Sequence, residues 1–365
     1  MVELYRTYMA ALRRQCRTLI DHLFADETKM PTMKKLVVLL LVVVFTFVSQ
    51  GMARAAPGSN KPPTVHRLTF AFHSAFLMNL HHFLYDMAVH KEKLAHVEWQ
   101  ITPTQDEMAA LAKAVSFYAV NYASLGIRDD PALVSIKRAL SVEDSKHDLT
   151  GLGLPADLAA VLESVAPVYA KNLWPVHDKS NRAWIAQASA LDAAYGADIQ
   201  TAIEHHMAAQ FPSLPIRVDM VSDTGSRQGA YTDEQTVMPS GRADYQKLAS
   251  LEMLYHEASH TTVTAPLEEA LSARLGATGR NPDSDLWHVV QFYTVGAVTR
   301  DVLARHGELG YQPYADKRGL YKGYWSPLML AVETAWRDHM AGKTDLQQAV
   351  RQMVDRLPLR GDGLH

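Results

Sequence analysis

The spacing of apolar residues divides the chain into two parts that meet near Pro212. Between residues 64 and 211 the apolar positions recur mostly at steps of three and four, which is typical of amphipathic helices. The predicted helical segments cover residues 71–85, 105–122, 157–173 and 178–211. We therefore predict a helical domain over residues 56–212.

The pattern changes after Pro212, where residues 216–221 alternate apolar and polar side chains as a half-buried strand does. A second short strand is predicted at residues 236–238. Helical spacing then returns in segments that cover residues 248–260, 267–275, 285–298, 327–340 and 346–357. Asp244 is the predicted N-cap residue of the first of these helices. The predicted fold class is α+β and predominantly α, with residues 213–365 as a second domain.

The most informative motif lies in the first of these helices, where residues 256–260 read His-Glu-Ala-Ser-His. On a helix, positions i and i+4 lie on one face, so His256 and His260 can bind one metal ion. Glu257 lies next to them, where its carboxylate can reach a water molecule at that ion. The alternative is a buried helix in which the two histidines only form hydrogen bonds.

The N-terminal segment predicts export. A charged start at Met33, an apolar run over residues 36–48 and the small residues around Ala55 form a secretory signal peptide, residues 33–55. An uncleaved anchor is the alternative. Residues 1–32 are a doubtful extension, which we attribute to a start codon placed too early, although an amphipathic helix also fits. The expected location is periplasmic or secreted, with no stable membrane anchor after cleavage.

Composition narrows the possible ligands and partners. The single cysteine, Cys16, lies in the doubtful extension, so a metal site in the remaining chain would use His, Glu or Asp. The formal net charge of −3 and the lack of a basic cluster argue against nucleic acid as a partner. The composition does not fix the oligomeric state.

The order of strand, HExxH helix and further helices over residues 216–288 resembles the zincin metallopeptidases, and most of all their gluzincin branch. The resemblance implies that His256 and His260 bind Zn²⁺ and that Glu257 is the general base. It also implies that residues 231–238 bind the substrate backbone. Two departures exist: Val263 and Pro266 replace the Gly and His of the metzincin extension, and residues 279–282 lack the gluzincin glutamate.

The third metal ligand is therefore open between several side chains. His288 lies in an otherwise apolar helical segment, where burial without a partner is costly, so it is the favoured ligand. Glu268 is the alternative, together with Glu269, although acidic residues are common in a first helical turn. Asp283 is a further candidate, and Asp285 has an equally good role as an N-cap. A satisfied core histidine is the other interpretation of His288.

These residues predict an exported zinc metallopeptidase that acts on a peptide or amide substrate. Glu257 would accept the proton of a zinc-activated water that attacks the carbonyl carbon. Tyr321 and Tyr324 are candidate catalytic residues that stabilise the oxyanion, although packing would also explain them. Two other functions stay open: a helical binding or scaffold protein with a structural or inactive zinc site, and a zinc amidase acting on a non-peptide or peptidoglycan amide.

Two pairs of adjacent histidines are given no metal role. His81 with His82, and His205 with His206, are neighbours along the chain. Neighbouring residues on a helix point about 100° apart and cannot bind one ion together. We predict that both pairs cap helices or pack in the core; the alternative is that His81 or His82 reaches the cleft from the helical domain.

Overall fold

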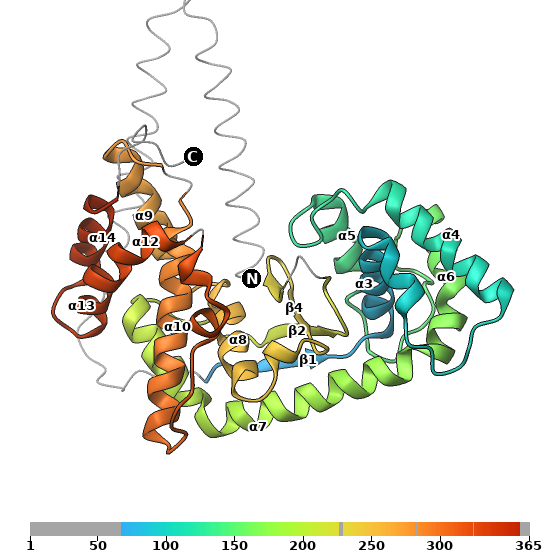
Figure 1. Cartoon of the computed structure of the whole chain (residues 1–365), viewed down its shortest axis with the longest axis horizontal. Coiled ribbons are helices and arrows are strands. Elements are labelled where there is room, and N and C mark those ends of the chain that lie inside the picture. Colours follow the sequence, from blue (N-terminus) through green and yellow to red (C-terminus); the bar gives the residue numbers. More distant parts are fainter. Residues whose placement is uncertain (1–66, 226–228, 282–283, 324, 358–365) are drawn as a thin grey trace, which may run out of the picture. The chain divides into compact units, whose positions relative to one another are not determined.

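The computed structural model describes residues 67–225, 229–281, 284–323 and 325–357, which form helices around one small sheet (Figure 1). The predicted signal peptide, the extension before it, Asp283 and Tyr324 lie outside the described residues. The predicted fold class, α+β and predominantly α, is confirmed. In the described part of the chain no helix combines the length and the apolar character that crossing a membrane requires.

Four strands form the sheet in the order β1-β2-β4-β3. Their bounds are β1 Phe70–His73, β2 Ile216–Val221, β3 Tyr231–Thr232 and β4 Thr236–Pro239. Strands β1, β2 and β4 are parallel, and β3 pairs antiparallel with β4 at one edge. The predicted strand at residues 216–221 is confirmed.

The prediction of a helix over residues 71–85 was wrong for its first residues, because residues 71–73 belong to strand β1. Four residues are too few to show a period of two, and the partner of Phe70 is Ile216, 146 positions later. No local pattern reveals a pairing over that distance. The helix of this segment, α3 (Phe76–Val89), begins only after the strand.

Three more helices complete the N-terminal part: α4 (Gln105–Asn121), α5 (Pro131–Leu140) and α6 (Ala156–Asn172). The helices predicted at 105–122 and 157–173 are thus confirmed to within one residue. Helix α4 begins with a capping box between Thr104 and Glu107. Helix α5 was not predicted, although Asp130 caps it and Pro131 occupies its first turn, a common start signal.

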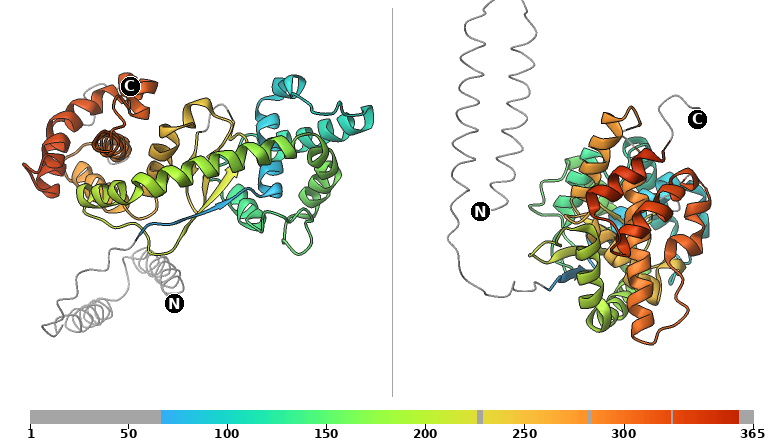
Figure 2. Two further views of the ribbon diagram at one scale, coloured as in Figure 1. Left: turned by 90° about the horizontal axis from the view of Figure 1, so that it is seen from below. Right: turned by 90° about the vertical axis from the view of Figure 1, so that its left-hand side faces the viewer.

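Helix α7 (Trp174–Met207) is 34 residues long and runs along the molecule beneath the sheet (Figures 1 and 2). One face of it is apolar because Trp184, Ala188, Ile199 and Ile203 recur at helical spacing and are buried. The indole Nε1 of Trp184 donates to the backbone carbonyl of Tyr245 at 2.8 Å. This bond ties the long helix to the segment that leads into the HExxH helix.

The HExxH helix is α8 (Leu248–Ser259), and the helices after it are α9, α10, α11, α12, α13 and α14. Their bounds are α9 Ala265–Ala277, α10 Leu286–Arg305, α11 Tyr314–Arg318, α12 Ser326–Ala331, α13 Arg337–Met340 and α14 Leu346–Asp355. The prediction that Asp244 is the N-cap of this helix was wrong. Lys247 precedes the helix, and Asp244 lies in a short 3₁₀ turn. Its carboxylate instead accepts bonds of 2.9 and 3.0 Å from Arg242.

The sheet separates two hydrophobic cores. Its residues Ile216, Val218 and Met220 join the C-terminal core, which α8 to α14 and most of α7 share. Val221 and Val237 point the other way and join the N-terminal core of α3 to α6. This alternation follows from the period of two along a strand, so each face of the sheet is covered by helices.

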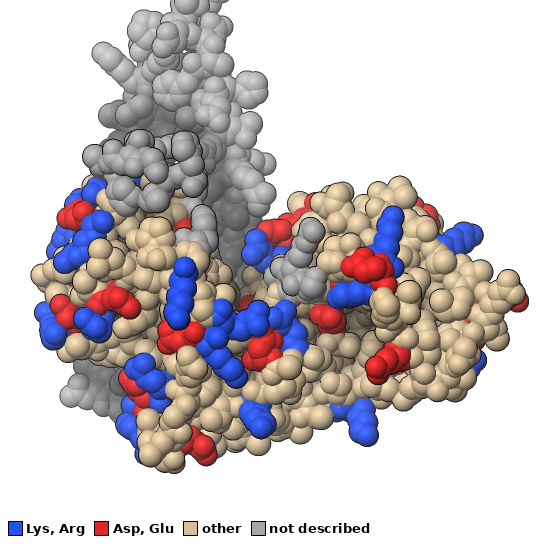
Figure 3. Space-filling view, viewed as in Figure 1, with Lys and Arg blue, Asp and Glu red and all other residues tan. Residues whose placement is uncertain are grey.

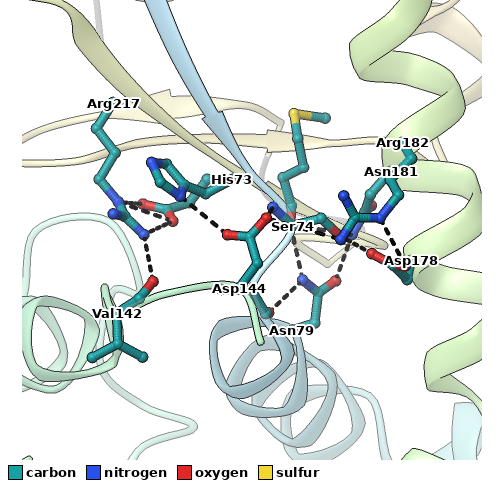
Figure 4. Close-up of polar contacts among 12 residues, drawn as sticks. His73, Ser74, Asn79, Val142, Asp144, Asp178, Asn181, Arg182 and Arg217 are labelled. Atoms are coloured by element: carbon teal, nitrogen blue, oxygen red, sulfur yellow. Dashed lines mark hydrogen bonds and ion pairs between the residues drawn. The ribbon is translucent and has the colours of Figure 1, made fainter. Parts of the chain in front are cut away.

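A partly buried polar cluster joins these layers where β1 ends, and we call it the polar joint: His73, Ser74, Asn79, Asp144, Asp178 and Asn181 (Figure 4). Asn181 of α7 is fully buried. Its amide nitrogen lies 3.0 Å from Ser74 Oγ, 3.1 Å from Asn79 Oδ1 and 3.2 Å from the backbone carbonyl of Met220. One side chain thus connects the ends of β1 and β2 with α3 and α7.

Candidate metal centre

Helix α8 is buried on nearly every side, because it lies between α7, α10 and the β3–β4 edge of the sheet. Leu251, Tyr255 and Ala258 form its apolar stripe and pack in the C-terminal core. The opposite stripe contains His256, while His260 follows at the C-terminal end of the helix. The predicted i, i+4 arrangement of the two imidazoles is thus present.

Helix α10 brings the third imidazole to this pair. His288 lies in its first turn, and its Nε2 is 3.4 Å from His256 Nε2. The Nε2 of His260 is 3.3 Å from the same atom. The ligand atoms of the three rings all lie within 4.8 Å of one another, so the cluster can hold a metal ion.

The spacing of the nitrogens fits a metal better than it fits hydrogen bonds alone. Zinc–nitrogen bonds of about 2.0–2.1 Å at tetrahedral angles place two ligand nitrogens about 3.3 Å apart. An imidazole nitrogen has one bonding position, so His256 Nε2 can share a proton with only one of its two neighbours. A metal ion at the centre satisfies all three nitrogens at once.

Burial keeps these rings neutral, which is the form that binds metals. Desolvation lowers the pKa of His256 well below its usual value, and the neighbouring imidazoles add to the shift. Burial likewise lowers the pKa of His260 to about 3 and that of His288 to about 4. The cluster therefore offers three lone pairs at neutral pH without prior loss of protons.

Aromatic side chains enclose the rings and fix their planes. Phe292 stacks on His256 with ring centroids 3.8 Å apart, and Trp287 stacks on His288 at 4.9 Å. Trp325 meets His288 edge-on at 5.3 Å. Such walls hold ligand rings in place and lower the local dielectric constant, which strengthens electrostatic effects inside.

Gln291 connects the two helices that carry the ligands. Its Nε2 donates to the backbone carbonyl of His256 at 2.8 Å, one turn after His288 on α10. This bond sets the register between α8 and α10. The Nδ1 atom of His256 and the Oε1 atom of Gln291 are both buried, and neither has a hydrogen-bond partner within the residues that the structure describes.

Glu257 lies beside the cluster and faces strand β3. Its side chain is buried, and Oε2 accepts a 2.9 Å hydrogen bond from Thr232 Oγ1. Burial raises the pKa of this carboxyl to about 8, against the lowering effect of the Thr232 hydrogen bond. Thr232 was missed by sequence reasoning, because a threonine in a two-residue strand carries no signal of its own.

None of the remaining candidates among the described residues belongs to the group that can hold a metal, and the others lie outside the described residues. Glu268 and Glu269 are exposed on α9 and do not belong to the group that can hold a metal. Asp285 accepts a bond from Trp325 Nε1 at 3.3 Å instead. Tyr321 lies in the 3₁₀ turn Leu320–Lys322 and packs against the C-terminal core, where burial raises its pKa. The role predicted for Tyr324 falls outside the described residues.

The adjacent histidines of α3 pack in the core, as their spacing indicates. His81 is fully buried and its Nδ1 lies 2.9 Å from Tyr118 Oη, while His82 Nε2 lies 2.8 Å from Tyr231 Oη. His82 also bonds to the backbone carbonyl of Met78 through Nδ1 at 2.9 Å. These contacts place His82 against the strand that carries Thr232.

Comparisons with known proteins do not add a family to this picture: no protein-family model, no curated protein and no solved structure matches the chain. The functional assignment therefore depends on the residues themselves. They form a buried cluster of His256, His260 and His288 that can hold a metal ion.

Proposed function

We propose that this chain is a zinc-dependent metallopeptidase that hydrolyses a peptide or amide bond. The observation that carries the proposal is the convergence of three imidazole nitrogens at 3.3 and 3.4 Å with a buried carboxylate next to them. Catalytic zinc sites use three protein ligands and leave one position for water or substrate. A structural site would fill the fourth position with another side chain, and the group that can hold a metal has three members among the described residues.

The donor set favours zinc over other metals. Three neutral imidazoles without a thiolate suit borderline ions, whereas calcium and magnesium require oxygen ligands. Among the borderline ions zinc accepts tetrahedral geometry without an electronic preference, and two nitrogen–nitrogen distances of 3.3 and 3.4 Å match that geometry. Copper would favour a planar arrangement.

The side chains around the site have separate tasks in this mechanism. Zinc, when bound, supplies Lewis acidity that polarises a carbonyl group and acidifies water. A bound cation would lower the pKa of about 8 that burial gives the Glu257 carboxyl, so that the group would ionise. The Glu257 carboxylate then accepts the proton from the attacking water, and Thr232 holds one of its two oxygens so that the other is free to do so. Phe292 and Trp325 keep bulk water away from the ligand rings.

Strand β3 supplies a place for the substrate backbone. It pairs with β4 on one side only in the sheet of the described residues. An extended peptide that adds to the other side would run past Thr232 and hence past Glu257. We also propose that residues 33–55 direct the chain out of the cytoplasm, so that the substrate is a periplasmic or extracellular peptide or amide.

The decisive variant is Glu257→Gln, measured for zinc content, melting temperature and peptide hydrolysis. We expect the zinc-loaded wild type to cleave a peptide library. The variant should keep zinc and stability but lose about 100- to 10,000-fold in kcat, because general-base catalysis contributes that much. Glu268→Gln, which changes an exposed carboxylate on α9, is the control and should leave turnover unchanged. Zinc-loaded wild type that cleaves no peptide or amide would assign the metal a structural role.

A further inference from the structure

Strand β3 connects the metal centre with the N-terminal part of the chain, although it is only two residues long. Its residues Tyr231 and Thr232 point to opposite faces of the sheet, as successive residues of a strand do. Tyr231 packs in the N-terminal core, and Thr232 donates to Glu257 of α8 at 2.9 Å. A strand this short is weakly held by its own pairing, so the contacts that fix Tyr231 also determine where Thr232 lies.

A directional chain of hydrogen bonds holds the hydroxyl group of Tyr231. The Nδ1 atom of His82 lies 2.9 Å from the carbonyl oxygen of Met78, which can only accept, so this nitrogen carries the hydrogen. Burial lowers the pKa of His82 to about 3, so the ring is neutral and its Nε2 is an acceptor. The Tyr231 hydroxyl group therefore donates to Nε2 of His82 at 2.8 Å. Its oxygen is left to accept a hydrogen bond from another donor.

Lys137 of α5 is that donor. Its Nζ atom lies 3.4 Å from the hydroxyl oxygen of Tyr231 and 4.5 Å from the centre of the same ring, whose face attracts an ammonium group. It also donates to the backbone carbonyl of Arg128, in the segment before α5, at 3.1 Å. Burial lowers the pKa of Lys137 to about 8, against the raising effect of nearby carboxylates such as that of Asp233, so the ammonium form predominates at neutral pH.

The place of Lys137 is unusual for a charged side chain. Figure 3 shows acidic and basic side chains mixed over the drawn surface, where water solvates them. Lys137 is 1% exposed, and none of the groups that its ammonium contacts within the described residues is a carboxylate. A buried charge without an ion pair is costly, so an apolar side chain of similar length would serve stability alone better. Such departures from local rules are expected at functional sites.

Two further contacts of α5 fasten the turn of the hairpin. Arg138 pairs with Glu234, and Gln235 Nε2 donates to Ser141 Oγ. The pair of Arg138 is exposed, and exposed ion pairs contribute little to stability. Lys137 is the buried contact of α5 with the hairpin, and it reaches the strand β3 itself.

We propose that Lys137 is a positioning residue for Glu257. By holding Tyr231, it keeps Thr232 where its hydroxyl group fixes one oxygen of the Glu257 carboxylate. Thr236 supports the same geometry, because its hydroxyl oxygen lies 3.1 Å from that of Thr232. Within the described residues the ammonium group contacts none of the three metal-binding histidines, so its effect passes through β3. This inference rests on the proposed metallopeptidase function.

Hydrogen exchange of the metal-free full chain tests the positioning without any turnover. The variant is Lys137→Met, which keeps a long unbranched side chain and removes the charge. We expect the backbone amides of residues 230–237 to exchange about 10-fold faster than in the wild type, as loss of a hydrogen bond from a charged group does, with those of α8 unchanged. The midpoint of urea denaturation should not fall, because an apolar group replaces a buried charge. Lys113→Met makes the same change at an exposed position of α4 and should match the wild type in both measurements.

Turnover of the zinc-loaded full chain tests the link to Glu257. Lys137→Met should keep one equivalent of zinc and lose about 10-fold in kcat, because catalysis is sensitive to small displacements of a catalytic group. Thr232→Val, which removes the hydroxyl group between β3 and Glu257, should also lower kcat. Since Lys137 acts through Thr232, the double variant should be no slower than Thr232→Val alone.

The two proposals fail in different ways. An unchanged exchange rate at β3 in Lys137→Met, a fall in its urea midpoint, or kcat losses that multiply in the double variant overturns the role of Lys137, while hydrolysis by the wild type still supports the proposed function. Zinc-loaded wild type that cleaves no peptide or amide overturns the proposed function and the catalytic part of this inference. The exchange rates then decide separately whether Lys137 fixes β3.

Discussion

At the scale of single residues, His256 is the centre of the cluster. Its Nε2 is the atom that both other ring nitrogens approach, and Phe292 covers its ring. His288 is half-buried and comes from another helix, α10. A ligand from a separate helix makes metal binding depend on how α8 and α10 pack.

The identity of the third ligand is a direct test at this scale. We expect His288→Ala to reduce bound zinc from one equivalent to near zero, because two imidazoles remain where three are required. Glu268→Ala should keep a full equivalent, since this carboxylate is exposed on α9. Metal analysis of the purified chains after dialysis gives the answer. Loss of zinc from Glu268→Ala, with zinc retained in His288→Ala, would reverse the assignment.

The site residues that could be predicted from the sequence are those whose role is indicated by the residues next to them in the chain. The spacing of His256 and His260 is contained in five residues, and His288 was favoured because it is polar in an apolar segment. Thr232 and Gln291 could not be found this way. These two residues contact the metal site only because β3 and α10 pack against α8, and no pattern in the adjacent sequence indicates that packing.

At the scale of elements, periodicity predicted the long helices well and short or nonlocal features poorly. Helices α4, α6 and α7 show many turns of one pattern, whereas β1 has four residues and a distant partner. Asp244 was placed as a cap because caps are usually acidic or hydroxylated, but Arg242 and Tyr314 bind its carboxylate instead. Tertiary contacts outweighed the local preference there.

If the polar joint holds the elements together, removing its central amide should lower the free energy of unfolding. Asn181→Leu keeps the branched shape of the side chain but removes the hydrogen bonds of its amide with buried partners, among them the 2.6 Å bond that Ser240 Oγ donates. Each unsatisfied buried group costs about 1–3 kcal/mol, so we expect a loss of about 2–4 kcal/mol in the free energy of unfolding. Urea denaturation measures it. Ser189→Ala, at an exposed position of the same helix, should change the same quantity by less than about 0.5 kcal/mol, and an equal change in both variants would contradict the role given to the joint.

At the scale of the whole molecule, the sheet and α7 connect two cores. Residues of α7 pack in the C-terminal core, while its N-terminal turn meets the helices of the N-terminal core. Strand β3 contacts both parts of the chain, because Tyr231 lies 3.4 Å from Lys137 Nζ of α5 and Thr232 donates to Glu257 of α8. The domain boundary placed at residue 212 stays a prediction.

Two buried carboxyls with raised pKa values, Glu257 and Glu252, give the global stability of the metal-free chain a pH dependence, and Glu252 lies outside the metal centre. Glu252 on α8 is 1% exposed and accepts hydrogen bonds from Tyr311 Oη at 2.6 Å and from the backbone N–H of Tyr314 at 3.0 Å. Burial raises the pKa of Glu252 from 4.5 to about 7. The folded state therefore holds a proton over this interval that the unfolded state has released, so stability is full below pH 4.5 and falls as the pH rises through 7.

We expect the metal-free chain to lose stability between pH 5 and pH 8, by at most about 3 kcal/mol from this group. Urea denaturation in the presence of a chelator measures the change at both pH values. Glu252→Gln has no proton to release, so its stability should vary less over the same interval. A slope in the variant as steep as that of the wild type would show that another group is responsible.

The pairing of β1 with β2 has a consequence for the growing polypeptide on the ribosome. Phe70 is made 146 residues before its partner Ile216. At about 5–20 residues per second, this interval lasts roughly 7–30 s. During that time the backbone of β1 has no strand to pair with, and Phe70 and Phe72 are accessible to other unfolded chains. We therefore expect this segment of the nascent chain to need protection from aggregation.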